Sequence, residues 1–239
     1  MLGTAAVGMM YASTYPSQKD NTASLPEALR ESLHIDATAA GYLQASVFGL
    51  ILPLLAMIYG AATGSRAVGG EEGSGQLDLV LAHPLTRTRL VLQRFAALAT
   101  GAGAISAMVW LALLALLAVR DSAELTSVTP AELLAQCMNL ALLGIVFGAL
   151  ALGLGAAFGR RTVVLAGTAA IGILAYTAHT FAAQIGADQL AYLSPFHHYI
   201  GGQPLRNGFQ WADMGILAAT ANALVGLGAW RLAGRDIDT

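Results

Sequence analysis

The chain has 239 residues, of which 56% are hydrophobic and only 11% are charged. Soluble domains carry about a quarter charged residues, so this composition excludes an ordinary soluble domain and predicts an all-α protein that crosses a membrane several times. The formal net charge of −2 carries little information by itself, and nothing in it indicates a nucleic-acid partner. The one cysteine, Cys137, lies inside an apolar run, where we expect a small buried hydrophobe rather than a disulfide or thiolate metal site.

Six apolar stretches are candidates for membrane-spanning helices, each of which needs about 20 residues. The first is short and lacks the basic start of a signal peptide. We interpret it as a first span whose cytoplasmic half is missing from the sequence, and a short tilted helix near the surface is the alternative. The predicted spans are about 1–15 (partial), 41–63, 95–119, 133–159, 162–187 and 212–230. All of them belong to one transmembrane domain, 1–239.

The basic residues gather on one side of these spans. One side has the loop 64–94, the turn between the fourth and fifth spans, and the C-terminal tail; it carries Arg66, Arg87, Arg89, Arg94, Arg160, Arg161, Arg231 and Arg235. The other side, with the loops 16–40 and 188–211, carries Lys19, Arg30, Arg120 and Arg206. The positive-inside rule therefore predicts a cytoplasmic C-terminus, and we expect a multi-pass protein of the bacterial plasma membrane.

The loop 64–94 is longer than a simple hairpin needs. Glycines at 69–70 and at 73 and 75 flank Glu71 and Glu72, and we expect them to interrupt the helix. Next, Leu77, Val80 and Leu81 recur at i, i+3 and i+4, which predicts a short amphipathic helix with acids near its start. Such a helix could rest on lipid, but its acidic side favours contact with a protein partner.

The segment Glu71–Arg89 (EEGSGQLDLVLAHPLTRTR) resembles a segment of the ABC-2 type permeases, the membrane halves of ATP-binding-cassette exporters, in the NosY-like and actinobacterial antibiotic-efflux branch. The segment Leu193–Gly208 is similar to an outer loop of the same branch. The resemblance implies six spans, a type V exporter-like fold, and a coupling helix that docks on a nucleotide-binding subunit through Glu71, Glu72, Leu77 and Arg87, to which the apolar stripe adds Val80 and Leu81.

The resemblance also implies the partners. We expect two copies of an ABC ATP-binding subunit, and a second copy of this chain or a sister permease. No phosphate-binding loop of the G-x-x-x-x-G-K-[ST] type occurs in the sequence, so ATP and Mg belong to the partner, and we expect no catalytic residue, metal or cofactor in this chain.

Two other classes stay open at this point. An intramembrane enzyme could use the Glu71-Glu72 pair, but Gln76 stands where the resembling proteases have arginine, and the adjacent His197 and His198, expected at the surface, lack a third metal ligand. A membrane scaffold or assembly factor without transport is harder to exclude, and it predicts no dependence on the glutamates.

Polar and aromatic residues inside the spans are candidates for the wall of a transport cavity, because polar groups are costly in lipid. They are Gln44, Phe48, Gln136, Asn139, Tyr176, His179 and Asn222. A mostly apolar wall suits a drug-like or lipid-like hydrophobic substrate. In the outer loop, Tyr192, Phe196, Tyr199, Phe209 and Trp211 predict an aromatic belt at the membrane surface. Three G-x-x-x-G patterns, at 60–64, 144–148 and 155–159, predict close helix packing.

Overall fold

The computed structural model describes residues 43–72, 87–119, 128–181 and 188–233, which are almost entirely helical and contain no strand. The predicted all-α class is confirmed. Within the described part of the chain, five helical stretches are long and apolar enough to cross a membrane. They are η1 (Leu43–Ile51) continuing into α5 (Leu52–Glu72), then α7 (Arg87–Val119), α8 (Pro130–Phe158), α9 (Arg161–Phe181) and α13 (Trp211–Ala233). These correspond to the predicted second to sixth spans, while the predicted first span and the loop 16–40 lie outside the described residues.

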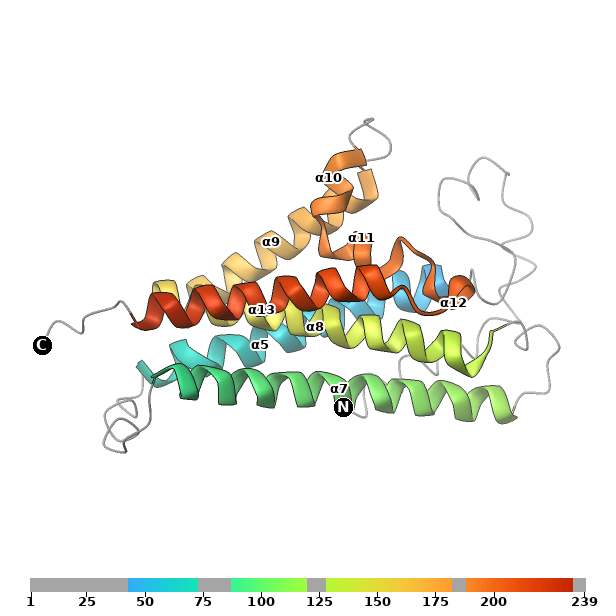
Figure 1. Ribbon diagram of the computed structural model, residues 1–239, viewed down its shortest axis with the longest axis horizontal. Helices are drawn as coiled ribbons and strands as arrows, with labels where there is room; N and C mark the ends of the chain where they lie inside the picture. Colours follow the sequence, from blue (N-terminus) through green and yellow to red (C-terminus); the bar gives the residue numbers. More distant parts are fainter. Residues whose placement is uncertain (1–42, 73–86, 120–127, 182–187, 234–239) are drawn as a thin grey trace, which may run out of the picture.

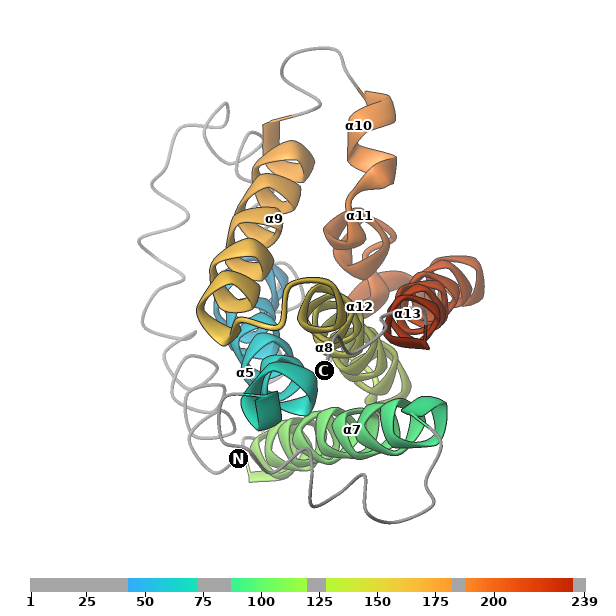
Figure 2. The same cartoon turned by 90° about the vertical axis from the view of Figure 1, so that its left-hand side faces the viewer.

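Helix α8 is the centre of the fold. It packs against α5, α7, α9 and α13, which surround it in the end view (Figure 2). Of its membrane-spanning stretch 61% is buried, against 17% for α9. A helix that is apolar on all sides belongs in the interior of a bundle, and this pattern explains why α8 takes that place.

Local sequence fixes both ends of α8. Thr129 caps the start: its side chain accepts from the backbone N–H of Glu132, and the Glu132 carboxylate accepts from the Thr129 N–H at 2.7 Å. This reciprocal pair satisfies two N–H groups that the first turn leaves open. At the other end Gly159, with φ 68°, takes the left-handed conformation that ends the helix. Gly159 therefore acts as a helix cap, and the close packing predicted from 155–159 stays a prediction.

The other two glycine patterns meet in one seam between α5 and α8. A Cβ added at Gly60 would lie 2.5 Å from the carbonyl oxygen of Gly144, and one added at Gly64 would overlap the carbonyl oxygen of Gly148. Because only glycine leaves room for such an approach, the two backbones are in direct contact. The close packing predicted from 60–64 and 144–148 is confirmed.

The predicted helix break at 69–70 is wrong. Helix α5 continues through both glycines and ends at Glu72. Glycine costs about 1 kcal/mol relative to alanine inside a helix, which weakens a helix but does not end it. As a consequence Glu71 and Glu72 lie in the last turn of α5 rather than at the start of the next helix.

Candidate functional site

One end of the bundle collects the arginines. In Figure 1 the end of α5, the start of α7, the turn between α8 and α9, and the end of α13 all lie at the left. The arginine side chains described as exposed there are Arg66, Arg89, Arg160, Arg161 and Arg231. Residues from four separate parts of the sequence thus form one cationic end, as the charge distribution along the chain predicted.

Of the predicted partner-docking residues, those that the structure describes fall at this end. Glu71 and Glu72 close α5, and Arg87 opens α7. Leu77, Val80 and Leu81 lie outside the described residues. Acidic residues in the last turn of a helix face the negative end of its dipole, which is an unfavourable place for them without a cationic neighbour or partner.

The predicted cavity residues separate into two groups. Phe48, Gln136 and Asn139 are fully buried close to Tyr199, which the sequence had assigned to the aromatic belt rather than to the cavity. Tyr176 is half-buried and meets Phe196 edge-on, with ring centroids 5.3 Å apart.

The remaining predicted cavity residues lie elsewhere. Asn222 is exposed and donates to the Ala218 carbonyl of its own helix at 2.8 Å. His179 is partly buried, with its ring 6.0 Å from that of His197. Gln44 belongs to η1, and the structure does not describe the position of its side chain. A role in lining a cavity therefore stays a prediction for these residues.

A small cavity of about 30 Å³ lies between α5, α7 and α8, lined by Leu52, Tyr59, Ser106 and Leu140 among others. This volume holds a water molecule or two and no drug-sized compound. None of the predicted cavity residues lines it. Tyr59 closes one side, where its hydroxyl donates to the Leu98 carbonyl at 3.1 Å.

Three buried polar atoms near Tyr199 make no hydrogen bond of standard geometry with the described residues, although Gln136 lies close to the Tyr199 hydroxyl, whose pKa is raised by burial and lowered to a smaller extent by the Gln136 side chain. These atoms are both amide atoms of Gln136 and the Oδ1 of Asn139. The Nδ2 of Asn139 is satisfied, because it donates to the Tyr199 carbonyl at 3.2 Å. Unsatisfied buried polar groups cost about 1–3 kcal/mol each, so the apolar packing around Gln136 and Asn139 has to offset the cost of burying their amides.

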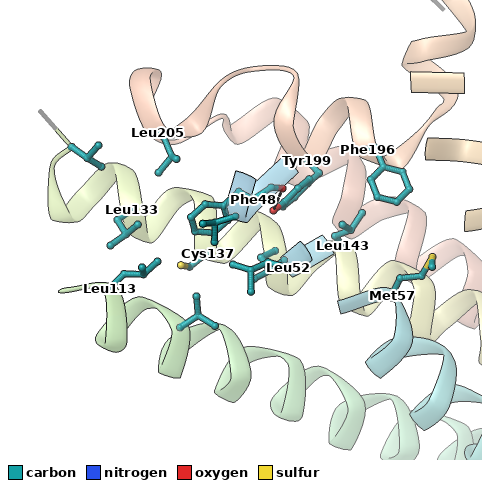
Figure 3. Packing of buried hydrophobic residues seen from close by; sticks show 14 of the residues in the cluster. Phe48, Leu52, Met57, Leu113, Leu133, Cys137, Leu143, Phe196, Tyr199 and Leu205 are labelled. Carbon is teal, nitrogen blue, oxygen red and sulfur yellow. Dashed lines mark hydrogen bonds between the residues drawn. The ribbon is translucent and has the colours of Figure 1, made fainter. Parts of the chain in front are cut away.

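The region expected as the outer loop 188–211 is instead a packed element of three short helices, α10 (Asp188–Leu193), α11 (Pro195–Ile200) and α12 (Pro204–Asn207). Phe196 and Tyr199 are 4% and 1% exposed and join the core (Figure 3), so their predicted place in an aromatic belt is wrong. Tyr192 and Trp211 are exposed, and Phe209 stacks on Trp211. We call α10–α12 the outer element.

Hydrogen bonds attach the outer element to the spans. Ser194 caps α11, and its hydroxyl donates to the Ala175 carbonyl of α9 at 2.8 Å. His198 Nδ1 lies 2.7 Å from Asp213 Oδ1 in the first turn of α13. His198 is 8% exposed, so the expectation of a surface histidine is wrong for this residue.

His197, next to it, has a different environment. Its ring lies 4.4 Å from that of Tyr192 and 5.3 Å from that of His198. Burial lowers the pKa of His197, nearby His198 lowers it further, and Asp213 acts in the opposite direction. Among the described residues, no group of three or more histidine, cysteine or acidic side chains is placed to hold a metal ion.

Among the described residues, five apolar helices with a shared cationic end indicate a multi-pass membrane protein. The chain belongs to the ABC-2 transporter family: the family described as "ABC-2 family transporter protein" matches residues 2–237, nearly the whole length. Proteins of this family are membrane permease subunits, which work in general with an ABC ATP-binding partner. The match is to the family as a whole, so the NosY-like branch stays a prediction. A comparison with curated proteins found no match.

Proposed function

We propose that this chain is the permease subunit of an ATP-driven exporter and that its cationic end is the cytoplasmic docking face for a separate ATP-binding subunit. The observation that carries the proposal is the convergence of α5 and α7 on that end. Helix α5 ends there with Glu71 and Glu72, and α7 begins there with Arg87 (Figure 1). The segment that joins these two spans therefore starts and ends on one face, at the same end as Arg160 in the turn between α8 and α9, Arg161 of α9 and Arg231 of α13.

Charge supports the orientation of this face. By the positive-inside rule, the exposed arginines favour a cytoplasmic location for this end, where α13 also ends. Glu71 and Glu72 are acidic residues in the last turn of α5, and we propose that they contact basic side chains of the partner. We propose that Leu77, Val80 and Leu81 supply the apolar part of the contact.

The packing of α5 against α8 indicates how movement at the docking face would reach the rest of the bundle. Helix α5 is in direct backbone contact with the central α8 along the glycine seam, so a push on its cytoplasmic end moves both helices together or slides one along the other. We propose that two permease chains, identical or sister, enclose the pathway and that two ATP-binding subunits drive it. The substrate that we propose is the hydrophobic, drug-like or lipid-like compound that the mostly apolar cavity wall predicted from the sequence suits.

Co-purification from the native membrane tests the docking face. Wild-type protein is expected to bring an ABC ATP-binding subunit with it after gentle detergent extraction, whereas Glu71→Ala combined with Leu77→Asp loses that subunit. The matched control is Leu193→Asp, the same change at a residue 84% exposed on the outer element. Retention of the subunit by the double variant contradicts the docking face. Absence of any ATP-binding subunit from the wild type favours a scaffold instead.

A further inference from the structure

Tyr199 of the outer element reaches the main chain of the second span. Its hydroxyl donates to the carbonyl oxygen of Phe48 at 3.0 Å, across 151 positions of sequence. Phe48 and Tyr199 are 0% and 1% exposed, and both lie in the largest apolar cluster (Figure 3). A hydrogen bond this deep has no water to replace it, so its loss leaves a buried acceptor open.

The Phe48 carbonyl lacks the backbone donor that the hydrogen-bond pattern of its helix would give it. Residues 43–51 form a π-helix, in which each carbonyl bonds to the N–H five residues further on. For Phe48 that position is Pro53, which has no N–H. The π-helix ends at Ile51 and an α-helix starts at Leu52, so the carbonyl lies at the junction of two helix types. The Tyr199 hydroxyl supplies the donor that proline removes.

Hydrogen bonds with α8, α9 and α13 fix the position of Tyr199 and of the short helix that carries it. Its own carbonyl accepts from Asn139 of α8 at 3.2 Å. The short helix that carries it is attached to α9 through Ser194 and to α13 through His198. The junction in the second span is therefore fastened, through one hydroxyl, to an element that three other spans hold in place.

We propose that Tyr199 is a positioning residue for an articulated joint in the second span: its hydroxyl fastens the proline-interrupted π-helix to the outer element, and release of that bond lets the outer part of the span move relative to α11. The proposal rests on the proposed function in one respect only, that movement begins at the cytoplasmic end of α5. The joint itself depends on the π-helix, Pro53 and Tyr199, and its test needs neither ATP nor a substrate.

The chain contains its own reporter for this joint. Cys137 is the single cysteine, it is 1% exposed, and it belongs to the same apolar cluster as Phe48 and Tyr199 (Figure 3). The rate at which N-ethylmaleimide labels Cys137 in detergent-extracted protein therefore measures how often this cluster opens. Tyr199→Phe removes the hydroxyl and keeps the ring, and we expect it to raise the labelling rate about tenfold, as for the loss of one buried hydrogen bond.

A double-substitution cycle identifies the cause. Pro53→Ala restores an N–H at the position that the Phe48 carbonyl lacks, so Tyr199→Phe in that background is expected to raise the labelling rate less than twofold. Pro53→Gly, which restores the same N–H without a Cβ, is the second background should the alanine variant be poorly extracted. Such non-additivity is the signature of two groups acting on one carbonyl.

Tyr176→Phe is the matched control, because Tyr176 touches Phe196 in the same region and no hydrogen bond of its hydroxyl is described. Its labelling rate is expected to equal that of the wild type. The proposal is overturned by an unchanged rate in Tyr199→Phe, or by the same increase from Tyr199→Phe with and without Pro53. Loss of ATPase binding in the docking experiment leaves this labelling result unaffected, so the two proposals fail separately.

Discussion

The side chains of His198 and Asp213 meet at 2.7 Å, which joins the outer element to the first turn of the last span. The other ring nitrogen of His198 lies 2.9 Å from the Tyr192 carbonyl. Because a carbonyl oxygen can only accept, Nε2 donates to Tyr192, and Nδ1 shares a proton with the Asp213 carboxyl group. Both partners of the ring are thus fixed by geometry, and the pair closes the contact between α10, α11 and α13.

Removing the carboxylate tests this contact. Asp213→Ala is expected to lower the free energy of unfolding by about 2 kcal/mol, because a nearly buried imidazole loses a charged partner. Thermal unfolding of the protein in detergent measures the change. Thr220→Val on the same helix is the control, since Thr220 is exposed and its hydroxyl bonds only to the Ile216 carbonyl of its own helix. Equal melting temperatures for Asp213→Ala and the control would show that the pair contributes nothing.

The glycine seam predicts a sharp dependence on position. Gly60→Ala is expected to destabilise the protein by about 1–3 kcal/mol, because its Cβ would lie 2.5 Å from the Gly144 carbonyl oxygen and backbones cannot yield as side chains do. Gly103→Ala on α7 is the control: nothing lies within 4 Å of its Cβ, so it is expected to be neutral or slightly stabilising. The idea of a backbone seam fails if both variants melt at the same temperature.

The unsatisfied amide predicts a stabilising change. Gln136→Met keeps the length of the side chain and removes two buried polar atoms without partners, so we expect a gain of about 1 kcal/mol in unfolding free energy. Asn139→Leu, one turn further along α8, is expected to destabilise instead, because it removes the donor to the Tyr199 carbonyl. Thermal unfolding compares the two. A loss of stability in Gln136→Met would indicate that its amide has a partner, either water or the hydroxyl of Tyr199.

The pH dependence of stability has a contribution from His197. Its pKa is lowered in the folded protein, chiefly by burial, so the unfolded chain binds the proton more readily. The contribution is therefore fully present above the ordinary histidine pKa of about 6.5 and is lost as the pH falls below it. The groups that face the ring are Tyr192, His179, His198 and Asp213.

We expect His197→Gln to reduce the loss of melting temperature between pH 7.5 and pH 5.5. Melting curves of the variant and the wild type at both pH values give the difference directly, and titrating groups common to both proteins cancel. A pH dependence as steep in His197→Gln as in the wild type would contradict this assignment.

The spans and the cationic end could be predicted because they depend on local properties of the sequence. The length of an apolar run predicts a membrane helix, and arginines outside the runs predict which ends lie together. The seam between Gly60 and Gly144 was also predictable in kind, since small residues four apart allow close packing. Its partner helix was not, because the pattern does not say which of several glycine-rich helices it meets.

The outer element could not be predicted in the same way. Aromatic residues next to polar ones are typical of a membrane surface, so Phe196 and Tyr199 were assigned to a belt, although both are buried. A local signal was present: Ser194 followed by Pro195 is the pattern of a helix start, and the structure uses it in that way. The contact of Tyr199 with Phe48 depends on folding across 151 positions, which no local pattern encodes.

The position of Glu71 and Glu72 shows that glycines alone do not predict where a helix ends. The expected position of these acids at the start of a helix followed from treating glycines as breaks, and the structure places them at the end of α5 instead. Their role in docking a partner stays a prediction.

A site-specific photo-crosslinker placed in the native membrane tests the central claim most directly. With the crosslinking residue at position 77, the account predicts a covalent adduct with an ABC ATP-binding subunit, and with the same residue at position 193 it predicts none. An adduct at position 193, or no adduct with such a subunit at position 77, would contradict a permease that docks its ATP-binding partner on the cationic end.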